Sequence, residues 1–98
     1  MLYLGERRVT EKLERVAGMK STEYFLFTKN RPDRAAIKDE WICQTIDNPI
    51  QEAVQSDGRI RRWRYIEEIG KHLRVILLDD GETVHNAFFD RNFKEQQR

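Results

Sequence analysis

The chain has 98 residues, of which 36% are charged and 39% are hydrophobic, and its formal net charge is +1. This length indicates one domain with one core, and an aromatic content of 10% argues against disorder. The small net charge excludes a basic field over the whole molecule, so contacts with nucleic acid must come from local clusters of cations. No apolar run approaches 18 residues and the start lacks a leader-like apolar stretch, so we expect a cytoplasmic protein without a membrane span.

The first 20 residues differ from the rest of the chain. Val9, Leu13 and Val16 recur at helical spacing, and Gly18 is a suitable residue to end a helix. We therefore expect residues 1–20 to be an N-terminal extension or a short amphipathic helix. Three roles stay open for it: packing on the domain, joining two copies in a homodimer, or fraying.

The domain itself is expected over residues 21–92, followed by a polar tail over 93–98. Its first part, residues 24–28, is a compact aromatic run that predicts a buried strand. Residues 29–34 form a turn with three cations. A helix is predicted over residues 37–47, and Asn48-Pro49 ends it. Its apolar face consists of Ile37, Trp41, Ile42, Thr45 and Ile46, and Cys43 within it is expected to be a buried, unreactive thiol.

From residue 50 on, the pattern is that of β-strands. Strands are predicted over residues 50–55, 59–69, 72–78 and 83–90, with glycine-containing turns between them. Asp57-Gly58 predicts a hairpin with a type I′ turn, which needs positive φ at both central residues. Together the elements read helix, strand, helix and a four-stranded meander. The predicted fold class is therefore α+β, a small antiparallel sheet of four to five strands with one or two helices on one face.

The strand after Asp57-Gly58 combines arginines with aromatic residues. Alternation along a strand places Arg59, Arg61, Trp63 and Tyr65 on one face, and Ile60, Arg62, Arg64 and Ile66 on the other. A sheet face with arginines beside aromatic rings suits contacts with phosphates and bases. The alternative is a solvated strand with Trp63 and Tyr65 in the core. The candidate nucleic-acid-binding residues are Lys29, Arg31, Arg34, Arg59, Arg61, Arg62 and Arg64.

Several short motifs resemble those of the small DUF4258 domains, which are similar in size and element order to the BrnT and RelE/ParE toxin superfamily. The motifs are Phe27-Thr28-Lys29-Asn30, Arg34, Ile37, Asn48-Pro49, Asp57-Gly58-Arg59, Leu73-Arg74-Val75 and residues 83–88. The resemblance covers about residues 24–91. It implies an antiparallel sheet with helices on one side, RNA cleavage on a ribosome or as a free enzyme, and an antitoxin partner. One position departs from the family: a histidine is often found where this chain has Asn30, and asparagine cannot act as a general acid or base near neutral pH.

Metal-independent RNA cleavage needs groups that transfer protons and cations that stabilise the charge developing at phosphorus. His85 is the candidate for proton transfer, because histidine titrates near neutral pH. Arg74 and Arg91 are the candidates that support the phosphate. For Arg74 the alternative is a structural ion pair with Glu67, Glu68 or Asp90. His72 opens the preceding strand, and we expect it to lie too far along the sheet to form a dyad with His85.

Three functions follow from these patterns, and one of them is a homodimeric structural protein joined by its N-terminal helix. The first is a toxin-like RNA-binding domain of a toxin–antitoxin system, with metal-independent RNA cleavage as its reaction. The alternative is a non-catalytic interaction module that retains the fold and binds protein or nucleic acid. No phosphate-binding glycine loop, zinc pattern or nucleophile elbow occurs in the sequence, so we expect no cofactor and no metal.

Overall fold

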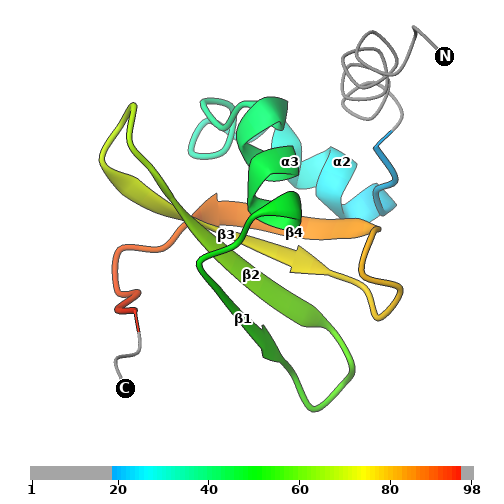
Figure 1. Ribbon diagram of the computed structural model, residues 1–98. Helices are drawn as coiled ribbons and strands as arrows, with labels where there is room; N and C mark the ends of the chain where they lie inside the picture. Colours follow the sequence, from blue (N-terminus) through cyan, green and yellow to red (C-terminus); the bar gives the residue numbers. More distant parts are fainter. Residues whose placement is uncertain (1–18, 96–98) are drawn as a thin grey trace, which may run out of the picture.

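The computed structural model describes residues 19–95, and this part of the chain forms two helices and four strands. In chain order these are α2 (Glu23–Lys29), α3 (Asp39–Asp47), β1 (Gln51–Val54), β2 (Ile60–Ile66), β3 (Lys71–Leu77) and β4 (Val84–Phe89). The strands form one antiparallel sheet in the order β1-β2-β3-β4, and both helices lie over the same face (Figure 1). The fold class is therefore α+β, as predicted. Residues 1–18 of the extension or helix expected over residues 1–20, and residues 96–98 of the tail, lie outside the described residues.

The strand predicted over residues 24–28 is wrong, because this segment is helix α2. Thr22 caps the helix: its side-chain oxygen accepts a hydrogen bond from the backbone N–H of Phe25 at 3.1 Å. Phe25 and Thr28, three residues apart, are buried, whereas Phe27 is 76% exposed. A strand would have buried alternate residues instead. Only one side of this segment packs on β4, and a helix places Phe25 and Thr28 together on that side.

Helix α3 agrees with the prediction in position and in its buried face. Ile37 just before it, and Trp41, Ile42, Thr45 and Ile46 within it, are all buried. Asp39 and Glu40 lie in its first turn, where the helix dipole favours negative charge. The helix is capped by Asn48, directly before Pro49. Cys43 is buried, as expected.

The sheet has one face under the helices and one face that the helices leave open, and alternation along the strands assigns each residue. Leu73, Val75 and Leu77 of β3 have no exposed surface and pack under the helices. Their partners on β2 are Arg64, Arg62 and Ile60. The residues between them in the sequence therefore project from the open face, which agrees with the predicted alternation.

The turns differ in detail from the prediction. At Asp57-Gly58 only Gly58 has positive φ, at 91°. The hairpin closes with the N–H of Gln55 donating to the carbonyl of Arg59 at 2.7 Å, and the N–H of Gly58 donating to the carbonyl of Gln55 at 2.9 Å. The loop therefore has three residues, 56–58. The prediction of a two-residue type I′ turn is wrong, because the extra residue allows Asp57 to keep a negative φ. Strand β2 ends at Ile66, three residues earlier than predicted, since residues 67–70 form a turn that Gly70 closes.

The prediction for the core concerns Trp41, which is 6% exposed and belongs to the same buried cluster as Phe25, Val75 and Leu77. We expect Trp41→Ala to lower the free energy of unfolding by about 3–5 kcal/mol, because the truncation removes a large buried side chain and leaves a cavity. Chemical denaturation measures this loss. Val54→Ala is the control, since Val54 is 68% exposed and should cost less than about 1 kcal/mol. An equally small loss in Trp41→Ala would contradict the assignment.

Candidate nucleic-acid interface

The open face of the sheet carries a row of arginines and aromatic rings. Antiparallel partners project to the same side of a sheet, so the register assigns residues from three strands to this face. They are Arg61, Trp63 and Tyr65 of β2, His72, Arg74 and Ile76 of β3, and Asn86 and Phe88 of β4. Trp63 lies outside the core under the helices but is only 5% exposed, whereas Tyr65 is 44% exposed.

The centre of the open face is a cluster of Arg74, Asp90 and Trp63. Asp90 Oδ2 accepts hydrogen bonds from Arg74 Nη2 at 2.7 Å, from Arg74 Nε at 3.1 Å and from Trp63 Nε1 at 3.1 Å. Burial by itself would raise the pKa of Asp90, but the hydrogen bonds from Trp63 and Arg74 and the charge of Arg74 outweigh it, so the pKa lies below its usual value. Arg74 therefore forms the ion pair with Asp90 that the sequence offered as the alternative to a phosphate clamp.

Phe88 connects this cluster to a groove at the end of β4. The guanidinium carbon of Arg74 lies 5.0 Å from the centre of the Phe88 ring, and that of Arg34 lies 5.3 Å from it. The groove has a volume of about 540 Å³, and we call it the cationic groove. Its lining consists of Asp33, Arg34, Lys71, Phe88, Phe89 and Arg91. Three cations and one carboxylate thus line a groove at the end of β4, where Phe88 projects to the open face and Phe89 to the helix side.

Each cation of the groove comes from a different element. Arg34 lies in the loop between α2 and α3, Lys71 begins β3, and Arg91 follows β4. Lys71 and Arg91 are exposed, and Lys71 Nζ lies 5.3 Å from the centre of the Phe89 ring. Cations held at the rim by aromatic rings keep their charges directed at solvent, where an anion can reach them.

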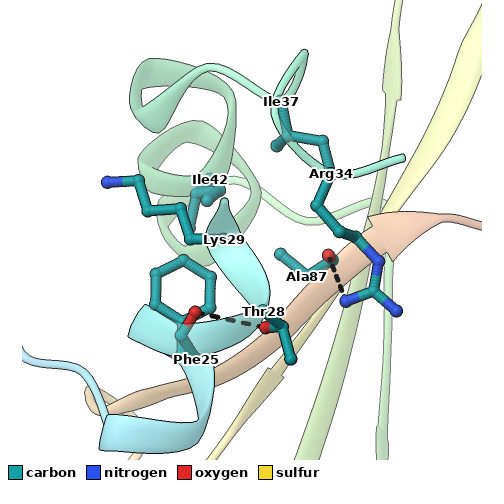
Figure 2. Close-up of a pocket in the computed structure, with 7 residues that line it drawn as sticks. All are labelled: Phe25, Thr28, Lys29, Arg34, Ile37, Ile42 and Ala87. Atoms are coloured by element: carbon teal, nitrogen blue, oxygen red, sulfur yellow. Dashed lines mark hydrogen bonds between the residues drawn. The ribbon is translucent and has the colours of Figure 1, made fainter. Parts of the chain in front are cut away.

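Arg34 is held more firmly than the other two cations. Its Nη1 donates to Asn86 Oδ1 at 2.7 Å and to the carbonyl oxygen of Ala87 at 3.5 Å. Figure 2 shows this side chain at the edge of a small pocket between α2, α3 and β4, with Thr28 donating to the carbonyl of Phe25 nearby. That pocket has a volume of about 10 Å³ and a mainly apolar lining, so it has room for a single water at most. It is a packing defect and not a ligand site.

His85 lies away from the groove, at the other end of β4. Its Nδ1 is hydrogen-bonded to Thr22 Oγ1 at 3.1 Å, and its ring stacks on that of Tyr24 with 5.0 Å between centres. Burial lowers the pKa of His85, and the positive charge of Arg59 adds to this effect. Phe88, the β4 partner of Arg74, lies three residues beyond His85 along the strand, and three strand residues span about 10 Å. The structure therefore does not bring together His85, Arg74 and Arg91, the three predicted catalytic residues.

The other predicted binding residues are spread over the molecule. Lys29 and Arg31 pair with carboxylates, at 3.1 Å from Asp39 and 3.6 Å from Asp33, and Arg59 lies 3.8 Å from Asp57. Arg62 and Arg64 lie on the helix side and donate to the carbonyls of Ile46 and Asn48, at 2.9 Å and 2.8 Å. There they provide hydrogen-bond donors for backbone carbonyls at the C-terminal end of α3, which have no partner within the helix. Arg61 is on the open face and Arg34 is in the groove.

Sequence reasoning missed Lys71 and Phe88 as candidates. Lys71 directly follows the glycine of a predicted turn, and Phe88 lies within the strand predicted over residues 83–90. Phe88 could have been found by pairing the last two strands. The register that pairs Leu73 with Phe89 also pairs Arg74 with Phe88, so Phe88 lies beside Arg74. To identify Lys71 as a candidate, one must know that the loop with Arg34 lies close to it, and no local sequence pattern gives the position of that loop.

Other classes of site have little support in residues 19–95. Within this range no three His, Cys, Asp or Glu side chains are arranged to hold a metal ion, and neither described helix is long and apolar enough to cross a bilayer. Comparison with protein-family models, with curated proteins and with solved structures found no match to this chain.

The prediction for this cluster concerns Asp90→Asn, which leaves Arg74 without its negative partner. Hydrogen bonds to charged groups typically contribute about 1.5–3 kcal/mol, so we expect the free energy of unfolding to fall by that amount at neutral pH. Because the pKa of Asp90 is lower in the folded state than in the unfolded state, its contribution is present above about pH 4 and is lost as the pH falls further. Urea denaturation from neutral to acidic pH should thus show a weaker dependence on pH in the variant.

Asp79→Asn is the control for this measurement, because Asp79 is exposed in the turn after β3. It should change stability by less than about 0.5 kcal/mol. Equal effects of the two substitutions would show that the carboxylate of Asp90 has no special role.

Proposed function

We propose that this domain binds RNA, and that the cationic groove holds the phosphate backbone. The observation that carries the proposal is a groove at the end of β4 whose lining includes the cations Arg34, Lys71 and Arg91 and the rings of Phe88 and Phe89. Cations supply most of the affinity for nucleic acid, and aromatic rings beside them accept unstacked bases. With a net charge of only +1, local clustering of this kind is what RNA binding requires.

The toxin-like class is part of this proposal and rests on the motifs quoted above. A four-stranded antiparallel sheet with helices on one face has the element order expected of such a domain, apart from α2 in place of the first strand. An antitoxin or a ribosome as partner has the same basis. Between binding alone and cleavage, the geometry favours binding alone, because His85 lies at the far end of β4 from the groove.

RNA cleavage is the second candidate, and the convergence of three cations in one groove favours it, since charge develops at phosphorus during the reaction. Asp33 is the carboxylate that lines the groove, and it would have to move the proton there. The stacked position of His85 on Tyr24 gives it no access to a phosphate held by Arg91.

The binding prediction concerns Arg91→Gln and Lys71→Gln, each of which removes one exposed positive charge from the groove. Each substitution should weaken the affinity for single-stranded RNA by about fivefold near physiological salt. Each should also lower the slope of log affinity against log salt by about 1, because one phosphate contact fewer releases counterions. Fluorescence anisotropy with a labelled RNA at several salt concentrations measures both quantities.

Lys20→Gln is the matched control. It also removes one positive charge, but Lys20 lies beside Val84 at the opposite end of β4 and pairs with Glu82 at 3.5 Å. Its affinity and salt slope should equal those of the unmodified protein. Equal losses in all three variants would indicate a general charge effect and would remove the groove from the proposal.

The cleavage prediction separates the two candidates by single-turnover assays with purified protein. Binding without cleavage is the expected result. If cleavage occurs in the groove, His85→Ala should retain full activity, whereas Asp33→Asn should lose about 10²-fold or more, the usual contribution of a proton-transfer group. A selective loss of cleavage in His85→Ala, with RNA binding unchanged, would contradict this geometry and support the assignment made from the sequence.

A further inference from the structure

Phe93 occupies a stacking position on the open face of the sheet. Its ring centre lies 4.9 Å from that of Trp63, with 21° between the ring planes, and 4.9 Å from that of His72. Phe93 belongs to the segment after β4, which turns to the side of the sheet opposite the helices (Figure 1). The backbone of this segment is held locally: Asn92 N–H donates to Asp90 Oδ1 at 3.1 Å, and Phe93 N–H donates to the Asp90 carbonyl at 3.4 Å.

Trp63 is a stacking platform that the chain itself covers. It projects from the open face, away from the core under the helices, and is nevertheless only 5% exposed. Its neighbours on that face include Phe93, Arg74, Asp90 and its β1 partner Gln51. An offset, nearly parallel arrangement of two rings at about 5 Å is also the geometry in which a nucleobase stacks on an aromatic side chain. Phe93 thus occupies a site of the size and shape that a base requires.

We propose that an unpaired base of a single-stranded nucleic acid takes the place of Phe93 on Trp63, and that the C-terminal segment is its intramolecular competitor. The inference rests on the proposed function, because the cationic groove must hold the backbone of the same strand. A duplex stacks its own bases and leaves no ring face for Trp63. The ligand class is therefore single-stranded nucleic acid, and the affinity is set in part by how readily Phe93 leaves.

Arg74 lies between Phe88 of the cationic groove and the platform residue Trp63. The guanidinium carbon of Arg74 lies 5.0 Å from the ring centre of Phe88, which lines the groove, and 5.3 Å from that of Trp63. Lys71 and Phe89 project to the helix side, so a strand with a phosphate at Lys71 and Arg91 passes around the end of β4 and past Phe88 to reach Trp63 on the open face. The charge is also suitable, because Arg61 shares the open face with Trp63.

The experiment measures the affinities of labelled probes for the unmodified chain and for Phe93→Ala by fluorescence anisotropy. The probes are a short single-stranded RNA, the DNA strand of the same sequence, the RNA duplex, and an abasic strand of the same length and charge. Without its competitor, the platform should bind the RNA and DNA single strands about twofold to tenfold more tightly. Affinities for the duplex and the abasic strand should not change, because neither presents an unpaired base. A larger gain in affinity for the RNA strand would indicate that RNA is the preferred ligand, and equal gains would indicate that either nucleic acid can bind. Both results support the replacement of Phe93 by a base.

Two further variants keep the test decisive. Phe93→Leu retains apolar cover over Trp63 but removes the ring, so it should shift the affinity in the same direction if Phe93→Ala does not fold. Phe27→Ala removes an identical ring from α2, where Phe27 is 76% exposed, and should leave all affinities unchanged. If the unmodified chain binds single strands and both Phe93 variants bind them equally well or more weakly, the exchange is overturned while RNA binding stands. If no variant binds any probe, the proposed function itself fails.

Discussion

The carboxylate of Asp90 is the constraint on which the open face depends. It accepts hydrogen bonds from Trp63 on β2 and from Arg74 on β3, and it directly follows β4, so one side chain ties three strands together. Because it holds the guanidinium of Arg74, that group lies along the rings of Phe88 and Trp63. The same residue fixes the turn after β4, which carries Arg91 to the groove and Phe93 to Trp63. A buried ion pair adds little net stability, and in this fold its main effect is to position neighbouring groups.

Four of the eight arginines among residues 19–95 are used to build the fold. Arg62 and Arg64 satisfy carbonyls at the end of α3, Arg74 pairs with Asp90, and Arg34 fastens its loop to β4. Lys71 and Arg91, in contrast, are exposed where they line the groove. The charge that matters for an anionic partner is therefore the local charge of the groove and not the composition of the β2 strand.

The sequence predicted the elements whose pattern is set by burial on one side. Trp41, Ile42 and Ile46 gave the face of α3, and the alternation of Leu73, Val75 and Leu77 gave the buried face of β3. The prediction failed at residues 24–28, where an aromatic run suits a strand as well as a helix, and the cap at Thr22 and the packing on β4 decide between them. The candidate site was harder to predict, because Arg34, Lys71 and Arg91 are far apart in the sequence. Cations on β2 were visible as a cluster, yet alternation sends Arg62 and Arg64 to the helix side.

The proposal that RNA lies in the cationic groove and across the open face can be tested by titrating the ¹⁵N-labelled protein with a short single-stranded RNA and recording two-dimensional NMR spectra. If RNA binds there, the signals of Lys71, Phe88, Arg91 and the indole N–H of Trp63 shift together, with one apparent affinity, while those of Tyr24, Phe27 and Val54 stay in place. Shifts confined to α2 or to the outer edge of β1, with the groove unaffected, would contradict it.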